Sequence, residues 1–366
     1  MSHPAVASAV EFLAQCGVPS VRLHAARSLS SARRFGPVRS LRDDAERDMF
    51  ARDVRDLFLL PYAEARRTGR LRGRASGVLG SSLSSNAAVA MNALLARGCH
   101  EPGDSLKFIL SDMLERAHPE GFCYEPHQED ELRRGAARGP GAFLLVTANY
   151  VRFLIAFGQG RDPRVRRAMD WLVSRQSRDG AWRAVPPDDL RGDVESYLLT
   201  RAVAEAFSEL PVQSMRRYAS ARRRLASAWA NRVLPTFGDP DAVLTYLNIT
   251  SDPQGPGRGG PLAEIPPRIA DRILYFALED LWLAAKVGAA PDHPHLAPWL
   301  EWLQDSQLAD GSWRLGDPSL RERLLVSDPN GRLRAEALFL TDEWITLRGA
   351  QIMQLVTRRS AAAVTA

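Results

Sequence analysis

Apolar residues recur at three- and four-residue intervals along most of the chain, and no stretch alternates apolar and polar positions as a strand would. The clearest examples lie within 162–183, 193–210 and 342–356, where polar residues fill the opposite helical face. This spacing predicts roughly a dozen amphipathic helices. We therefore expect an all-α protein.

Two segments, 162–183 and 293–314, match each other over about twenty residues without a gap. In each, a proline precedes a Trp-Leu pair by eight positions, a glutamine follows that tryptophan by five, and Asp-Gly-x-Trp closes the unit. The repeated residues are Gln176, Asp179, Gly180 and Trp182 in the first copy, and Gln307, Asp310, Gly311 and Trp313 in the second. Proline favours the first turn of a helix, and glycine after aspartate favours a tight turn. The pattern predicts that each helix starts at its proline (Pro163, Pro294) and ends in a turn.

Weaker copies of the same pattern occur elsewhere. Pro4 precedes Phe12-Leu13 by eight positions, and Glu120-Gly121-Phe122 is an altered Asp-Gly-Trp. A second helical stretch follows most copies, so the repeating unit is predicted to be a helical hairpin. The Pro- and Gly-rich segment 253–267 is interpreted as a long loop within one domain, because repeats lie on both sides of it.

The string Gln-x-x-Asp-Gly-x-Trp resembles the QW repeat of squalene–hopene-type terpenoid cyclases. Their hairpins close into an (α/α) toroid, which protein prenyltransferase β subunits share. The resemblance implies a single toroid domain over 1–366 with about six hairpins. The repeat-bearing core would cover about 85–357, and the helices of 1–84 would complete the toroid. It also implies that the repeated Gln, Asp and Trp residues are structural staples between neighbouring hairpins.

The composition is that of a soluble globular protein, with 45% hydrophobic and 25% charged residues. The net charge of +5 comes almost entirely from arginine, because Lys107 and Lys286 are the only lysines. This usage is typical of a high-GC bacterial genome. Acidic residues alternate with arginines over 22–74, which indicates a solvated, ion-paired helix face. We therefore expect no nucleic-acid partner.

Cysteine usage and hydropathy indicate the compartment. Cys16, Cys99 and Cys123 are far apart and form no Cys-x-x-Cys motif, so we expect reduced, mostly buried thiols in a cytoplasmic protein. The longest apolar stretch, 142–158, contains Arg152 and is shorter than the roughly 20 residues that a membrane span needs. No transmembrane span is expected. Peripheral contact with a membrane stays open.

Asp239 and Asp241 are the candidate catalytic residues. The resemblance implies an Asp-x-Asp-Asp motif whose middle acid protonates an alkene or epoxide, and Gly-Asp-Pro-Asp-Ala lies between the two good repeats with Ala242 in place of the last aspartate. Asp241 would be the general acid and Asp239 its hydrogen-bond partner. The same residues also fit a helix start, with Asp239 as N-cap and Pro240 in the first turn.

The resemblance also implies a second group of residues, which would line the cavity and bind substrate. Acids and aromatic rings open the helices that follow the good repeats, and acids also cap such helices in ordinary proteins. Aromatic faces could stabilise carbocations. The candidates are Asp193, Glu195, Tyr197, Tyr246, Tyr275, Glu343 and Trp344.

The sequence predicts no metal site and no cofactor. The acidic runs 43–48 and 188–193 lack the spacing of a Mg²⁺-binding helix, and no Asp-x-Cys accompanies a zinc-ligand set. The resemblance implies a terpenoid cyclase-like enzyme that would act on an isoprenoid or another small, apolar, polyunsaturated substrate. Protonation would initiate the cyclisation. The alternatives are a non-catalytic toroid that binds a hydrophobic or prenylated partner, and a different metal-independent reaction such as hydrolysis, elimination or isomerisation.

Overall fold

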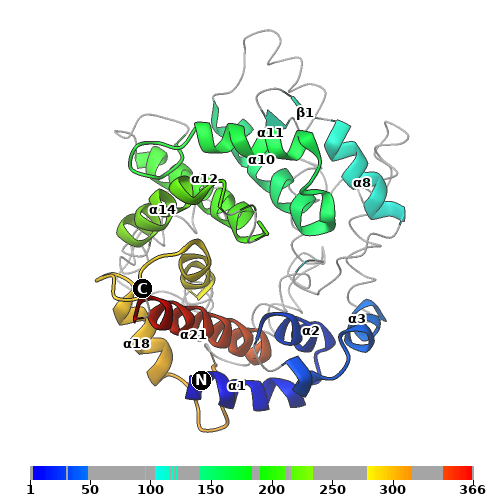
Figure 1. Ribbon diagram of the computed structural model, residues 1–366, viewed down its shortest axis with the longest axis vertical. Coiled ribbons are helices and arrows are strands. Elements are labelled where there is room, and N and C mark those ends of the chain that lie inside the picture. The colour runs from blue at the N-terminus through cyan, green and yellow to red at the C-terminus, as the bar shows by residue number, and fades with distance from the viewer. Residues whose placement is uncertain are drawn as a thin grey trace, which may run out of the picture. The chain divides into compact units, whose positions relative to one another are not determined.

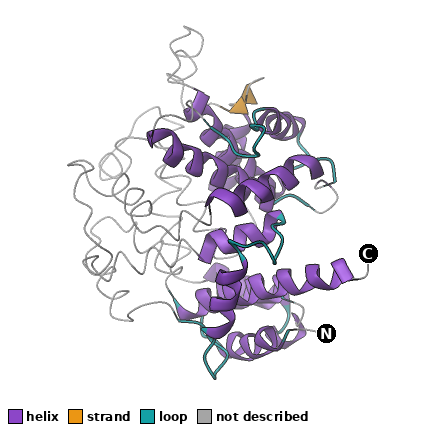
Figure 2. Ribbon diagram, turned by 90° about the vertical axis from the view of Figure 1, so that its left-hand side faces the viewer, coloured by secondary structure: helices purple, strands orange, loops and turns teal. Residues whose placement is uncertain are grey.

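A computed structural model of the chain describes residues 3–29, 32–47, 95, 104–115, 117–118, 121–122, 140–183, 190–211, 214, 216–233, 278–314 and 341–364. Most of these residues are helical (Figure 2). The named helices are α1 (Pro4–Gln15), α2 (Pro19–Ser28), η1 (Ala32–Phe35), α3 (Val38–Arg47), α8 (Asp104–Glu115), α10 (Pro140–Leu154), η3 (Ile155–Gln159), α11 (Pro163–Ser174), α12 (Leu190–Ser208), α14 (Ala219–Ala228), η4 (Trp229–Val233), α18 (Ala297–Asp305) and α21 (Asp342–Val364). A further helical stretch covers 278–287.

Strand pairing within the described residues is confined to one short ladder. The strands β1 (Ala117–His118) and β2 (Gly121–Phe122) pair antiparallel, with Ala117 opposite Phe122. The prediction of an all-α protein is therefore confirmed for the described part of the chain.

The described chain divides into two compact units. Unit 1 comprises 1–44 and 226–366, and unit 2 comprises 45–225, so the boundary falls inside α14. In unit 1, α1 and α2 pack against α21, which places the two ends of the sequence side by side (Figure 1). In unit 2, α10 packs along α12 and against α11. The single domain over 1–366 stays a prediction.

Proline starts the helices α1 and α11, as predicted. His3 precedes Pro4, and its Nδ1 accepts a hydrogen bond from the N–H of Ala5 at 3.3 Å. Asp162 precedes Pro163, and its Oδ1 accepts from the N–H of Arg164 at 2.8 Å. These side chains satisfy N–H groups that have no partner within the helix.

The helix of the second repeat starts later than predicted. We expected it to begin at Pro294, but α18 begins at Ala297. The N–H groups of Leu296 and Ala297 both donate to the carbonyl of His293, which forms a turn before the helix. Pro298 explains the difference, because it has no N–H to donate to the carbonyl four residues back and its ring would collide with that carbonyl.

The two good repeats end in the same turn. Gly180 has a φ of +92° and Gly311 a φ of +85°, in the left-handed region that glycine adopts without strain. Asp179 Oδ1 accepts a hydrogen bond from the N–H of Ala181 at 3.2 Å. Asp310 accepts from the N–H of Ser312, the matching residue of the second repeat, at 2.9 Å.

The glutamine of each repeat ties its turn to another helix. Gln176 Nε2 donates to the carbonyl of Gly180 at 3.0 Å and to that of Ala221, on α14, at 2.9 Å. In the second repeat, the same atom of Gln307 donates to the carbonyl of Gly311 at 2.9 Å. Its other acceptor, at 2.8 Å, is the carbonyl of Ala5 on α1.

The closing tryptophan of each repeat is buried and hydrogen-bonded on both sides. Trp182 donates its indole N–H to the carbonyl of Leu172 at 2.7 Å, on the helix before the turn. Its backbone N–H donates to Oγ1 of Thr200 at 3.0 Å, on the helix after the turn. Trp313 makes the same two bonds in the second repeat. Its indole N–H donates to the carbonyl of Leu303 at 2.5 Å, and its backbone N–H donates to Oγ1 of Thr346 at 2.9 Å. Through its indole and its backbone N–H, each tryptophan residue thus joins both helices of its hairpin.

A third turn uses Phe122 in place of tryptophan. The backbone N–H of Phe122 donates to Oγ1 of Thr147, on α10, at 2.9 Å, and the ring is fully buried. Gly121 has a φ of +115°, and a Cβ there would collide with the Thr147 hydroxyl. The altered copy therefore keeps the backbone contact of the two good copies.

Truncation of either closing tryptophan should destabilise the protein strongly. Trp182→Ala and Trp313→Ala should each lower the free energy of unfolding by about 3–5 kcal/mol, because each leaves a cavity and an unsatisfied carbonyl. Urea denaturation measures the change. The half-buried Trp299, on α18, is the matched control and should cost clearly less. Wild-type stability in either repeat variant would contradict the structural role of these residues.

The start of α11 should contribute stability that depends on pH. The side-chain hydrogen bond from Arg164 lowers the pKa of the Asp162 carboxyl. A lowered folded-state pKa stabilises the protein above the ordinary value of about 3.9, and this contribution disappears as the pH falls through the folded-state pKa. Asp162→Asn should cost at most about 1 kcal/mol at neutral pH, and the cost should shrink as the pH falls below the ordinary carboxyl pKa, because asparagine still caps the helix. Urea denaturation across this pH range measures the difference. A difference that does not change with pH would contradict the ion pair.

Candidate functional site

A buried cluster of charged and aromatic side chains lies between the helix 278–287 and α21 in unit 1. Arg348 Nε donates to Glu279 Oε1 at 2.7 Å, and these side chains are 13% and 9% exposed. The Arg348 guanidinium lies 4.0 Å from the ring centroid of Trp282 and 4.6 Å from that of Trp344. The indole N–H of Trp344 also donates to Glu279 Oε1, at 3.2 Å. One carboxylate oxygen therefore accepts from both a guanidinium and an indole.

Helical spacing brings these four residues together. Glu279 and Trp282 are three positions apart on one helix, and Trp344 and Arg348 are four positions apart on the other, so each pair lies on one face. The cationic and aromatic partners surround a carboxylate that would be costly to bury alone. The guanidinium stacks on indole faces, where its weak hydration and planar shape favour it over an ammonium group.

The cluster continues towards α2. Arg348 donates to Gln351 Oε1 at 2.9 Å, and Gln351 Nε2 donates to Ser28 Oγ at 2.8 Å. The ring of His24 meets Trp344 edge-on, with 5.7 Å between the ring centroids. Residues more than 300 positions apart in the sequence thus form one network.

The indole N–H of Trp282 is a buried donor. It makes no hydrogen bond to any residue that the structure describes. Lys286 lies one turn further along the same helix, with its ammonium 5.5 Å from the Trp282 ring centroid. The arrangement holds two cations against one indole, and Glu279 pairs with one of them, Arg348. The cluster can orient charge and accept hydrogen bonds, but the guanidinium of Arg348 already covers faces of Trp282 and Trp344.

Unit 2 contains a related ion pair between α10 and α12. Arg152 donates to Glu205 Oε2 at 2.5 Å, and Arg201 approaches the other carboxylate oxygen at 3.5 Å. The three side chains are 14–18% exposed. Each unit therefore joins two of its helices through a glutamate and an arginine that are both largely buried.

The structure describes part of the predicted site. Asp239, Asp241, Tyr246 and Tyr275 lie outside the described residues. Asp193 and Glu195 belong to the first two turns of α12, and the half-buried Tyr197 follows them. The half-buried Glu343 lies in the first turn of α21, as expected from its sequence position. Of the candidates that the structure describes, only Trp344 belongs to the cluster with Glu279 and Arg348.

Sequence reasoning missed Glu279, Trp282 and Arg348. Their signal was present, since Leu278–Lys286 reads Leu-Glu-Asp-Leu-Trp-Leu-Ala-Ala-Lys, with two acids next to a run of apolar residues. Asp280 is also fully buried. Acids in an apolar helix indicate a buried partner, but the sequence alone did not identify it as Arg348.

Among the described residues, no group of three or more His, Cys, Asp or Glu side chains is arranged to hold a metal ion. Within the same residues, no helix has the length and apolarity needed to cross a membrane. Cys16 is half-buried and free, and burial raises the pKa of its thiol. Cys99 and Cys123 lie outside the described residues.

Comparison of the chain with protein-family models, curated proteins and solved structures finds no match.

The pair of Glu279 and Arg348 should show strong energetic coupling. Glu279→Gln and Arg348→Met should each lower the free energy of unfolding by about 3–5 kcal/mol, because each leaves a buried charge without its partner. The double variant should lose clearly less than the sum of the two. Urea denaturation of the four proteins measures the coupling. Arg217→Met, which breaks an exposed pair with Asp170, is the control and should cost at most about 1 kcal/mol. Additive losses in the buried pair would contradict the coupling.

Proposed function

We propose that the chain is a single (α/α) toroid of helical hairpins and acts as a terpenoid cyclase-like enzyme. Its substrate would be an isoprenoid or another apolar, polyunsaturated molecule held in the central cavity. Protonation of the substrate would initiate cyclisation. The proposal rests on the resemblance of the two good repeats to the QW repeat, and on the contacts that these repeats make.

The contacts of Gln176 and Gln307 carry the proposal. Each glutamine fixes its own turn and donates to an alanine carbonyl on another helix, which belongs to α14 for the first repeat and to α1 for the second. Such contacts connect successive hairpins in a toroid. The second contact joins residues 302 positions apart. A last hairpin that contacts the first helix is what closure of a ring requires.

The proposed proton donor is Asp241, with Asp239 as its hydrogen-bond partner. An alkene is a very weak base, so its protonation needs a strong acid that stays protonated in a site sheltered from water. An adjacent carboxylate can hold the acid in place and orient its proton. The assignment rests on the sequence pattern and its position between the two good repeats.

The cluster around Glu279 would have a supporting role in this enzyme. Glu279 and Arg348 join two helices of unit 1, and Arg348 covers faces of Trp282 and Trp344. Trp344 is 1% exposed, so it would shape the wall of the cavity rather than present its face to a carbocation. The aromatic residues that contact the substrate would then be Tyr197 and the other predicted tyrosines.

Replacement of the proposed acid should abolish turnover. Asp241→Asn should give no detectable product, because an amide keeps the shape of the carboxyl group but cannot protonate carbon. Asp239→Asn should reduce turnover less, since an amide can still hydrogen-bond. Both proteins should melt close to the wild type, because asparagine suits a helix start almost as well as aspartate. The measurement is incubation with prenyl diphosphates and with squalene, followed by gas chromatography–mass spectrometry.

The exposed Asp292, in a turn of unit 1, provides the matched control. Asp292→Asn should leave product formation unchanged. Full activity of Asp241→Asn would exclude Asp241 as the acid. If the wild type forms no product from any of these substrates, the cyclase proposal fails, and a binding toroid or a different reaction takes its place.

A further inference from the structure

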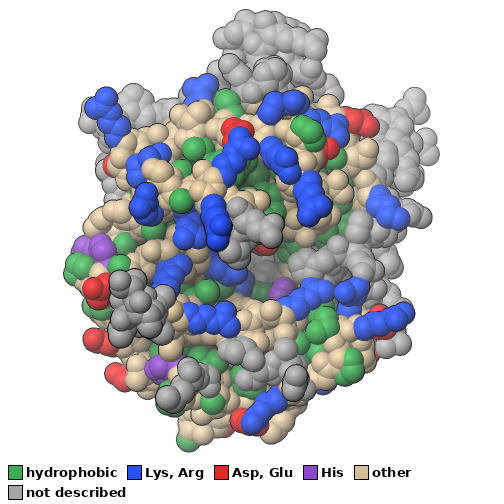
Figure 3. Space-filling view, in the orientation of Figure 1, with side chains coloured by type: hydrophobic (Ala, Val, Ile, Leu, Met, Phe, Trp, Pro, Cys, Tyr) green, Lys and Arg blue, Asp and Glu red, His purple; other side chains and the backbone are tan. Residues whose placement is uncertain are grey.

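Exposed arginines gather on one side of unit 2. They lie on α11, on the turn that follows it, and on the segment 216–224, which includes the start of α14. Figure 3 shows Lys and Arg side chains over this part of the molecule. The residues, which we call the arginine surface, are Arg166, Arg167, Arg175, Arg178, Arg216, Arg217, Arg223 and Arg224.

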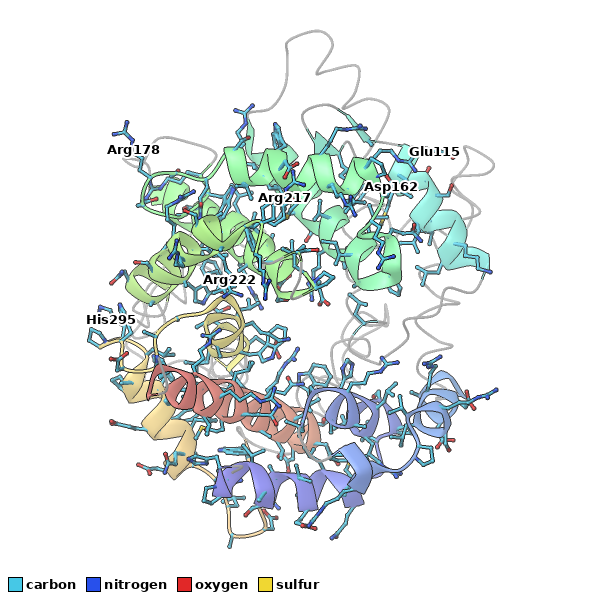
Figure 4. The ribbon with its side chains drawn as sticks, viewed as in Figure 1. Glu115, Asp162, Arg178, Arg217, Arg222 and His295 are labelled. Carbon is cyan, nitrogen blue, oxygen red and sulfur yellow. The ribbon has the colours of Figure 1, made fainter. Side chains whose placement is uncertain are left out.

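Two sets of hydrogen bonds hold these segments side by side. Asp170, on α11, accepts from Arg217 at 2.6 Å and from the hydroxyl of Tyr218 at 2.8 Å. Gln176 Oε1, in the turn after α11, accepts from Arg224 at 2.7 and 3.1 Å. In Figure 4, Arg217 lies beside α11, and Arg178 points away from the body of the unit. The arginines therefore belong to one continuous surface.

Among the residues that the structure describes, few acidic side chains balance this surface. Asp170 pairs with Arg217, and Asp179 pairs with Arg183, which is not one of the eight. Arg166 and Arg167 precede Asp170 by four and three positions, so they share its face of α11. Within the part of the chain that the structure describes, none of Arg167, Arg216 and Arg223 forms an ion pair. The surface thus carries a net positive charge of several units.

The surface offers charge without apolar groups. Leu308 is the only exposed large hydrophobic residue among those described, and it lies in unit 1. The two aromatic rings near the arginines are not exposed, since Tyr218 is buried and Trp171 is half-buried under Arg175. A partner would therefore be bound by electrostatic attraction, and no apolar side chain of this surface would insert into the partner.

We propose that the arginine surface binds the anionic face of a phospholipid bilayer. Guanidinium groups form paired hydrogen bonds with phosphate oxygens, and a negatively charged bilayer attracts each nearby arginine. A nucleic acid fits less well. Binding sites for single strands expose aromatic rings to stack on bases, and no such ring is exposed here. The turn at 216–218 is tied to the middle of α11 by Asp170, which obstructs the entry of that helix into a major groove.

The proposal does not depend on the proposed reaction, because it is tested on vesicles without substrate. The full-length protein is sedimented with phosphatidylcholine vesicles that contain either no anionic lipid or about 30 mol % phosphatidylglycerol. Binding should require phosphatidylglycerol, and it should fall steeply between about 0.1 and about 0.5 M salt as the charges are screened. Failure to sediment with the anionic vesicles at low salt would overturn the proposal.

Paired variants separate this surface from the general positive charge. Arg167→Gln/Arg223→Gln removes two exposed arginines of the surface, and Arg39→Gln/Arg358→Gln removes two exposed arginines of unit 1. The first should weaken vesicle binding by roughly 25-fold, at about fivefold per arginine, and the second should change it little. Melting temperatures check that all proteins are folded. Equal losses in both variants would overturn the assignment to this surface. A duplex DNA that binds more tightly than the vesicles, and loses affinity in the first variant alone, would assign the surface to nucleic acid instead.

Discussion

In each good repeat, the side-chain amide of one glutamine connects the turn of its own hairpin to another helix. An –NH₂ group has two donors, so Gln176 can satisfy the carbonyl of Gly180 in its own turn and that of Ala221 on α14 at the same time. The second acceptor lies inside a helix, where a carbonyl can accept an additional hydrogen bond because its oxygen has two lone pairs. Gln307 repeats this arrangement against α1. This double donation links the turn of each hairpin directly to another helix.

The three turns share one backbone hydrogen bond and differ in the side-chain contacts that they add. All three place a backbone N–H against a threonine hydroxyl of the next helix, through Thr147, Thr200 and Thr346. Only the two tryptophans add an indole bond to the preceding helix, whereas the buried ring of Phe122 has no polar group to donate. The backbone bond does not depend on the side chain, so the aromatic residue can change while the hairpin keeps its geometry. This explains why the third copy was weak as a sequence pattern but similar as a structure.

Charged side chains have different roles in the interior of the protein and on its surface. Glu279 and Arg348 are buried between helices, so each needs the other, and the indoles of Trp282 and Trp344 shield the pair from water. The arginines of α11 and 216–224 face solvent, where they repel one another weakly and can attract an anionic partner. In the proposed enzyme, buried charged pairs would thus join the helices that shape the cavity, and the exposed arginines would bind the protein to an anionic membrane.

The sequence by itself determined the helices, two of the proline-led starts and the turns, because these depend on residues within about ten positions of one another. It also marked the glutamines and tryptophans as a set, although it could not show their acceptors. Only the tertiary structure decided that Gln307 contacts Ala5 and that Arg348 is the partner of Glu279. These contacts join residues 302 and 69 positions apart, and no local pattern encodes such pairings. The position of Glu279 among apolar residues indicated that a buried partner was needed. Many arginines of the chain could have been that partner, and only the packing of the helices selects Arg348.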